Sequence, residues 1–281
     1  RILLYLLPEG SLFDRLYAFY LFIGKNKRLP NQLFLNDALY RLKVDGSLNN
    51  KLRRLTSDKE YVKNYIRELV GDQYNVPTKA VLKTKEDILS FAFKKGDVVK
   101  PTHASGYVKF IKEEPVDYDG LVGWLDINYY KKTREANYRF LDPKLIVEPP
   151  VFGRHNVDDI KFFTYKGNVR IIQVDMDRHT NHSRMLDDRT WLPLMASILY
   201  PLSKKIKSKP KHLNDMIQMV EQLAKPFGFV RVDLYYDEGS GQFFVGEITH
   251  CHESAGGIFN SPESEKLVSE ILFQNRKKSE I

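Results

Sequence analysis

Two runs of alternating residues near the C-terminal end constrain this chain most, because together they read as a β-hairpin with two different faces. Residues 229–236 and 242–248 flank Asp237-Glu238-Gly239-Ser240-Gly241, where two glycines favour a turn. A turn centred on Gly239 places five apolar side chains on one face: Val230, Val232, Leu234, Phe244 and Ile248. We expect that face to pack in the core.

The opposite face of this hairpin collects Arg231, Asp233, Tyr235, Val245 and Glu247. In this register Arg231 lies across from Glu247, and Asp233 is the diagonal neighbour of Glu247 at roughly 7–8 Å between backbones. Two carboxylates then converge from adjacent strands. Mg²⁺ binds through one or two carboxylates, with phosphate oxygens supplying other ligands, so the pair predicts a metal platform. The alternative is that both are solvated residues paired with Arg231.

The segment after this hairpin, residues 247–257, is rich in polar side chains and ends in Gly256-Gly257. Loops that follow buried strands commonly carry binding sites, which favours a site here. His250, Cys251 and His252 also suggest zinc, but no second ligand pair at a suitable spacing occurs elsewhere in the sequence. We therefore favour magnesium over zinc.

Two lysines emerge from apolar strands. Lys100 closes the run 97–99, and Lys161 lies between Ile160 and Phe162. Such lysines either extend to water or meet an anion such as phosphate. The segment His103-Ala104-Ser105-Gly106 follows Lys100 and offers small residues whose backbone amides could approach phosphates. A second hairpin, turning at Lys166-Gly167, is expected to put Lys161 and Arg170 on one face.

The rest of the chain predicts a mixture of helices and short strands. The first fifty-odd residues have helical spacing, and Thr56-Ser57-Asp58 caps a helix whose apolar positions run from Tyr61 to Leu69, before Gly71. Further expected helices cover residues 84–92, 212–225 and 263–273. Further expected strands cover residues 76–82, 97–100, 107–112 and 144–148. This pattern is typical of the α+β class.

Charge and cysteine content narrow the expected partners and compartment. Lys and Arg number 44 against 36 Asp and Glu, a net charge of +8 that attracts polyanions. No nucleic-acid-binding signature occurs, so nucleotides, phosphates and acidic glycans remain as the expected polyanionic partners.

A single cysteine suits the reducing cytoplasm. No apolar run approaches the ~20 residues of a membrane span. The aromatic stretch 16–24 leaves open a weak contact with the inner membrane surface.

Six short blocks occur in the order in which they appear in the ATP-grasp proteins of teichuronopeptide and capsule biosynthesis, the TupA-like branch. The sequence resembles that branch over roughly residues 33–270. The blocks are Ser57-Asp58-Lys59, Val98-Val99-Lys100-Pro101, Leu145-Ile146-Val147-Glu148, Asp159-Ile160-Lys161-Phe162-Phe163, Arg231-Val232-Asp233-Leu234-Tyr235 and Gly246-Glu247-Ile248-Thr249.

The resemblance implies an ATP-grasp fold of the α+β class, in which two lobes clamp ATP between antiparallel sheets. We expect a helical N-terminal segment (1–57), one lobe (58–147) and a second lobe with the metal-binding hairpin (148–281). By resemblance, the phosphates of ATP contact the lysines and the small-residue loop, and adenine and ribose contact the end of the 144–148 strand. These cofactor-binding positions are Lys100, Lys161, His103, Ser105, Gly106, Glu148, Pro149 and Val151.

The metal ligands implied by the resemblance are Asp233 and Glu247, with Thr249 at a position where many ATP-grasp enzymes have Asn. That departure leaves the number of Mg²⁺ ions open. Arg231, with Arg170 and Arg178 as alternatives, would hold the acceptor carboxylate or its phosphate. Lys161 and Arg231 are thus also catalytic candidates.

The chemistry implied is ATP-dependent ligation of a carboxylate to an amine. ATP phosphorylates the carboxylate, and an amine displaces phosphate from the acyl phosphate. The protein's part is to position the reactants and to neutralise the charge of the phosphates. His250 or His252 is a candidate base for the amine proton, unless either only contacts substrate. The expected partners are an acidic sugar or polysaccharide precursor and an amino acid or amine. The alternatives are a sugar kinase on the same fold and a non-catalytic glycan-assembly protein.

Overall fold

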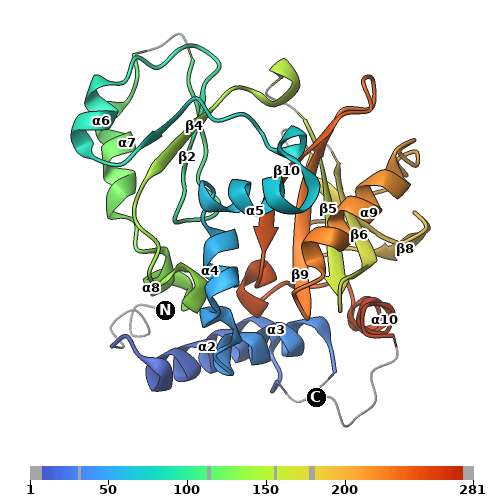
Figure 1. Cartoon of the computed structure of the whole chain (residues 1–281). Helices are drawn as coiled ribbons and strands as arrows, with labels where there is room; N and C mark the ends of the chain where they lie inside the picture. The colour runs from blue at the N-terminus through green and yellow to red at the C-terminus, as the bar shows by residue number, and fades with distance from the viewer. Residues whose placement is uncertain (1–7, 31–32, 113–114, 155–156, 177–180, 275–281) are drawn as a thin grey trace.

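A computed structural model describes residues 8–30, 33–112, 115–154, 157–176 and 181–274, and shows two antiparallel sheets above a helical base (Figure 1). The base lies at the bottom of the view and contains α2 and α3, with α4 and α5 rising from it towards the sheets. The bounds of these helices are Ser11–Asn26 for α2, Leu35–Val44 for α3, Lys51–Ser57 for α4 and Tyr61–Val70 for α5.

Asp58 starts helix α5 in the way the sequence predicts. Its carboxylate accepts hydrogen bonds from the backbone N–H groups of Glu60 and Tyr61, at 2.8 and 3.2 Å. The helix ends at Gly71, whose φ of 108° suits a residue without a side chain. Val62 and Ile66 face inward and pack in the core of the larger sheet. Helix α5 is therefore tied to that sheet, while the expected lobe boundaries stay a prediction.

The smaller sheet has four strands in the order β1-β4-β2-β3, all antiparallel. Its strands are Ala80–Leu82 (β1), Val98–Pro101 (β2), Lys109–Phe110 (β3) and Leu145–Glu148 (β4). Helices α6 (Lys85–Ser90) and α7 (Tyr118–Gly123) cover one side of it, with Ile88 and Leu121 in its core. A capping box of Thr84 and Asp87 starts α6 within the range that the sequence predicts.

The larger sheet has six strands in the order β10-β9-β5-β6-β7-β8, all antiparallel. Its strands are Asp158–Tyr165 (β5), Asn168–Met176 (β6), Ser183–Asp188 (β7), Pro193–Ala196 (β8), Phe229–Tyr236 (β9) and Phe243–Thr249 (β10). Helix α9 (Leu213–Ala224) packs on one face, and α3 and α10 (Pro262–Leu272) pack on the other. Neighbouring residues such as Phe162 and Phe163 therefore enter different cores.

The hairpin β9–β10 forms, but its register differs from the sequence prediction. A bulge at Gly246 shifts the pairing, so that Asp233 lies directly opposite Glu247, and Thr249 lies opposite Arg231. The predicted core position of Phe244 is wrong, because Val245 takes it. The bulge brings the two carboxylates closer together than the diagonal arrangement we expected.

The hairpin β5–β6 also contains a bulge. Its turn is at Lys166-Gly167, as predicted, with both residues at positive φ. The pairing passes from Phe163–Ile171 to Thr164–Val169, so Arg170 is left without a paired residue. Lys161 lies opposite Gln173, and the expected shared face of Lys161 and Arg170 is wrong for this reason.

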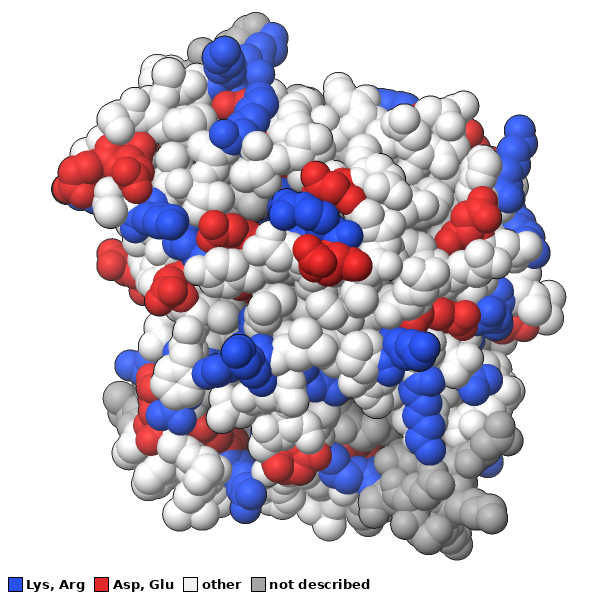
Figure 2. All heavy atoms as spheres, viewed as in Figure 1, with Lys and Arg blue, Asp and Glu red and all other residues white. Residues whose placement is uncertain are grey.

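Charged side chains of both signs are scattered over the face shown in Figure 2. On the described part of this face, Lys and Arg are interspersed with Asp and Glu and do not form one large basic field. Within the described ranges, no helix combines the length and apolar character that crossing a bilayer would require.

Candidate active site

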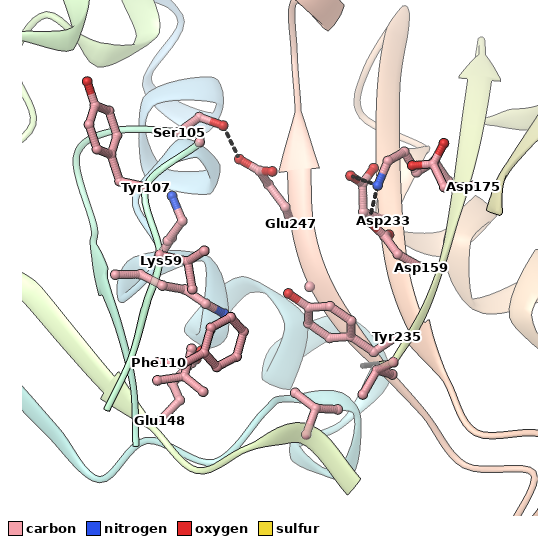
Figure 3. Close-up of a pocket in the computed structure, with 18 of the residues that line it drawn as sticks. Lys59, Ser105, Tyr107, Phe110, Glu148, Asp159, Asp175, Asp233, Tyr235 and Glu247 are labelled. Atoms are coloured by element: carbon pink, nitrogen blue, oxygen red, sulfur yellow. Dashed lines mark hydrogen bonds and ion pairs between the residues drawn. The ribbon is translucent and has the colours of Figure 1, made fainter. Parts of the chain in front are cut away.

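A cavity of about 660 Å³ lies between the two sheets and draws its walls from both (Figure 3). The four-stranded sheet contributes Lys100 and Glu148, and the loop between β2 and β3 contributes Ser105 and Gly106. The six-stranded sheet supplies the opposite wall. Its charged and aromatic contributions include Asp159, Lys161, Asp175, Arg184, Arg231, Asp233, Tyr235 and Glu247.

The β9–β10 wall places Asp233 and Glu247 side by side across the strands. Gly246 makes this possible, because a Cβ at this position would lie 2.8 Å from the ring of Tyr235. In Figure 3, Glu247 extends towards Ser105, whose hydroxyl donates to its carboxylate at 3.2 Å. The bulge therefore has a clear role, since it turns both carboxylates to one wall of the cavity.

Asp233 is held by two cations. Arg231 donates to both of its carboxylate oxygens at 2.7 Å, and the ammonium of Lys161 lies 3.2 Å from it. Burial disfavours the ionised form of Asp233, but the charges of Arg231 and Lys161 outweigh burial, so the pKa of Asp233 lies below its ordinary value. Lys161 also pairs with Asp159. Ion pairs thus hold two basic and two acidic side chains in fixed positions on this wall.

The facing wall has a similar pair on β2 and β4. Lys100 lies 2.8 Å from Glu148, which also pairs with Lys63 of α5 at 2.5 Å. Burial alone would raise the pKa of Glu148, but the two lysines lower it overall. The ammonium of Lys100 also lies 5.7 Å from the ring centroid of Tyr235, across the cavity. Glu148 is therefore an ion-pair partner of Lys100 as well as a lining residue.

The loop after β2 is anchored by a lysine from the turn between α4 and α5. Lys59 lines the cavity and donates to the backbone carbonyl of Ala104 at 2.5 Å, just before Ser105. Gly106 has a φ of 83° that favours glycine. His103 is buried and does not line the cavity, because its Nδ1 accepts from the backbone N–H of Lys144 at 3.4 Å.

The structure brings most of the predicted site residues to the cavity, but not all of them. Those that line it are Lys100, Ser105, Gly106, Glu148, Pro149, Val151, Lys161, Arg231, Asp233 and Glu247. Among the described residues predicted for the site, His103, Arg170, Thr249, His250 and His252 do not line it. Arg178 lies outside the described residues.

His250 is buried away from the cavity. Its ring nitrogens contact Arg53 at 2.9 Å and the hydroxyl of Thr56 at 2.7 Å, and burial holds its pKa well below the ordinary value. His252 is buried as well and contacts Arg231. The structure gives no support for either histidine as the base, because neither ring reaches the cavity.

Thr249 accepts a hydrogen bond from Arg231 at 3.1 Å and so lies beside the carboxylate pair without lining the cavity. The described part of the chain contains no group of three or more His, Cys, Asp or Glu side chains that could hold a metal ion. A magnesium site here would therefore rest on the two carboxylates of Asp233 and Glu247, with phosphate supplying other ligands, as Mg²⁺ allows.

Several lining residues were missed by sequence reasoning. Asp159 and Asp175 share the cavity face with Lys161, and applying the period-2 rule to β5 and β6 would have found both. Arg184 lies on β7, a strand that the sequence prediction omitted. Lys59 and Glu253 lie outside strands, where no periodicity marks them.

A family model described as "TupA-like ATPgrasp" matches residues 39–272 of this chain. A search of curated proteins finds no match. Among solved structures, two of D-alanine–D-alanine ligase from Bacillus anthracis are similar to it. The ATP complex has 18% identity and a TM-score of 0.42, covering 78% of this chain and 62% of that one. The second structure has 17% identity and a TM-score of 0.46, covering 82% and 71%.

The ATP-grasp ligase PsnB, with minimal precursor, Mg and ADP, is also similar, at 12% identity and a TM-score of 0.42 over 85% of this chain and 65% of that one. Structural likeness at this level supports no argument about function. The chain spans about three fifths of the length of the first of these proteins.

Proposed function

The chain belongs to the TupA-like ATP-grasp family, and on that premise we propose that it is an ATP- and magnesium-dependent carboxylate–amine ligase. The proposed carboxylate substrate is a uronic acid of a surface polysaccharide or its precursor. The proposed co-substrate is an amino acid or another amine, and the product is an amide.

One observation carries the proposal. Asp233 and Glu247 face each other across β9 and β10, on the wall of a 660 Å³ cavity whose facing wall presents Lys100. Ligand pockets of about 300–1,000 Å³ suit a molecule the size of a nucleotide. Phosphoryl transfer depends on positioning and on charge neutralisation, and both walls carry fixed charges for this purpose.

The nucleotide would lie between the walls. Lys100 and Lys161 are placed to neutralise its phosphates, and the segment Pro149–Val151 with Glu148 would contact adenine and ribose. Ser105 and Gly106 lie on the loop that faces Glu247, so their backbone amides are available near the phosphates. In exchange for phosphate contacts, Lys100 and Lys161 would loosen their present pairs with Glu148 and Asp159.

The side chains present fit magnesium. Two carboxylates on adjacent strands offer hard oxygen ligands, and the sole hydrogen bond described for the Glu247 carboxylate comes from the neutral hydroxyl of Ser105. Asp233 and Glu247 would hold the ion, with Thr249 nearby as a third oxygen. When bound, magnesium would neutralise charge on the phosphate oxygens of ATP.

The reaction would proceed in two displacements. A substrate carboxylate oxygen attacks the γ-phosphorus of ATP, ADP leaves, and Arg231 and Lys161 stabilise the negative charge of the resulting acyl phosphate. The amine then attacks the acyl carbon, loses a proton and expels phosphate. Arg231 is fixed in position by Asp233, so its charge is already oriented on the cavity wall. We assign no base role to His250, because it does not reach the cavity.

The net charge of +8 supports an anionic acceptor, while the cavity wall itself carries equal numbers of basic and acidic side chains. The test is release of ADP by the purified full chain with ATP and Mg²⁺, in the presence of uronic acids and amino acids. We expect ADP release that requires both substrates, and a product whose mass equals that of the amide. ATP binding without ADP release in any combination would contradict the proposal.

The same assay separates the kinase alternative. Phosphorylated sugar formed without any need for an amine would show that the cavity transfers phosphate to a hydroxyl. The variant Asp233→Ala is expected to abolish turnover. It also leaves Arg231 and Lys161 without their carboxylate partner, so circular dichroism of the variant accompanies the assay to show that the chain is folded. Unchanged turnover in that variant would remove Asp233 from the metal site.

A further inference from the structure

Helix α2 is apolar on both of its sides, which is unusual for a helix at the surface. Its inner side, with Tyr17, Ala18 and Phe22, is buried against the protein. At 100° per residue, the outer side spans an arc of about 100° that contains only apolar residues. These residues, here called the outer stripe, are Leu12, Leu16, Phe19, Tyr20 and Ile23.

Solvent reaches this outer stripe. Leu12 is 65% exposed, Leu16 41% and Tyr20 56%, and no other described helix has three such residues at a spacing of four. A helix that is hydrophobic all round is normally buried on every side. Exposed apolar patches of this kind mark surfaces that meet a membrane or another protein. The described part of the chain therefore leaves much of the outer stripe exposed, although apolar side chains favour burial.

The charges around the stripe favour an anionic cover. Arg15 lies beside the stripe and is exposed, and α2 ends in exposed Lys25 and Lys27. The acid on the helix, Asp14, points inward instead, where Arg134 pairs with it at 3.0 Å and Tyr130 donates to it. The outer surface of α2 thus presents Arg15 and apolar groups together, with Lys27 at its end and Glu9 just before it, whereas Lys25 lies on the inner side, next to Gly256.

We propose that the outer stripe of α2 docks on the surface of a membrane that contains anionic lipids. Leu12 and Leu16 enter the boundary between head groups and acyl chains, Tyr20 lies at head-group level, and Arg15 and Lys27 contact lipid phosphates. The helix has 16 residues and lies in the plane of the membrane surface. Figure 1 shows α2 at the base of the molecule, on the side away from both sheets, so docking would leave the cavity open.

The test is flotation of the full chain with vesicles of phosphatidylcholine alone and with vesicles containing about a third phosphatidylglycerol. We expect binding to the anionic vesicles, which high salt weakens. The double variant Leu12→Ser/Leu16→Ser is expected to lower partitioning by at least about tenfold, because it removes two buried apolar side chains. Arg15→Glu/Lys27→Glu is expected to lower it by a similar factor or more.

Matched controls use equally exposed positions elsewhere. Leu192→Ser removes a leucine that is 62% exposed on the six-stranded sheet side, and Lys83→Glu/Lys85→Glu reverses two exposed charges next to α6. Both controls should partition like the wild-type chain. Circular dichroism and ATP binding confirm that each variant is folded.

Three results would overturn the proposal. The full chain could fail to float with anionic vesicles, or the Leu12→Ser/Leu16→Ser variant could float as well as the wild type. The third is a concentration-dependent dimer of the wild-type chain that the same substitutions convert to a monomer, with no vesicle binding by the wild type. That result would identify a second copy of the chain as the partner of the outer stripe. None of these results bears on ATP turnover, so the ligase proposal is tested separately.

Discussion

The two walls of the cavity hold their glutamates in opposite ways. Glu148, on the four-stranded sheet, is buried between Lys63 and Lys100 at 2.5 and 2.8 Å. Glu247, on the six-stranded sheet, accepts from the hydroxyl of Ser105, and the described structure gives it no ion pair. The two lysines balance the charge of Glu148, which therefore contributes to stability, whereas Glu247 with its neutral partner keeps its charge available to a ligand. Asp233 is also held by two cations, and it would bind a metal only by giving up part of its pairing with Arg231 and Lys161. The comparison therefore separates a structural acid from a functional one.

The largest effect is expected on stability, from Glu148→Gln. This change leaves Lys63 and Lys100 as buried charges without their partner, and breaking a buried pair in this way costs roughly 3–5 kcal/mol. The free energy of unfolding from urea titration should fall by about that amount. A loss of unfolding free energy below 1 kcal/mol would show that solvent can replace the carboxylate as the partner of the two lysines. It would weaken the distinction between the two glutamates.

Glu247→Gln is expected to reverse the pattern. The amide can still accept from Ser105, so the free energy of unfolding should change little, while loss of the negative charge should lower ATP turnover by roughly 10²–10³-fold. Steady-state ADP release and urea titration measure the two effects. If this variant lost stability and kept turnover, the roles of the two glutamates would be exchanged.

Gly246→Ala tests whether the bulge sets the geometry of the metal platform. A Cβ there would lie 2.8 Å from the ring of Tyr235, and overpacking of this kind costs about 1–3 kcal/mol. The free energy of unfolding should fall by an amount in that range, and the activation free energy of ATP turnover should rise by a similar amount. The double variant Gly246→Ala/Tyr235→Leu removes the ring and should recover part of the stability. If stability is not recovered, the clash with the ring is not the cause of the loss.

The smallest effect concerns the pH dependence of stability. The pKa of Glu148 is lowered by its lysines despite burial, so its contribution to stability is present above the ordinary pKa and is lost as pH falls through the lowered value. Urea titrations from about pH 6 to pH 3 should show a shallower decline for Glu148→Gln than for the wild type. Equal slopes would indicate that Glu148 is not ionised in the folded protein.

The sequence predicts the fold well where burial follows a simple period. The helix at residues 212–225 matches α9 to within one residue, and the alternation in β9 identifies its core face. Strand β7 was missed because its buried positions include Arg184 and Asp187, so the strand lacks an apolar face that a pattern can detect. Ion pairing of Arg184 with Asp175 explains how the fold tolerates this burial.

The candidate site was predictable in its residues but not in its register. Alternation with the turn centred on Gly239 puts Asp233 and Glu247 on one face, but in the structure that shared face depends on the bulge, without which Glu247 would lie opposite Val232. Their direct opposition depends on a bulge, which a single glycine in a strand suggests but does not locate. The burial of His250 depends on Arg53 and Thr56, about two hundred residues away, and no local pattern reveals such contacts.

The most direct test of the central claim is metal binding by the full chain with a non-hydrolysable ATP analogue, followed by electron paramagnetic resonance of Mn²⁺ in place of Mg²⁺. We predict that Asp233→Asn and Glu247→Gln each weaken Mn²⁺ binding by at least about tenfold when the analogue is saturating. Folded Glu148→Gln should not weaken it under the same condition, because it would affect the nucleotide and not the metal. Wild-type Mn²⁺ affinity in both the Asp233 and the Glu247 variants would contradict the claim that this pair of carboxylates holds the metal.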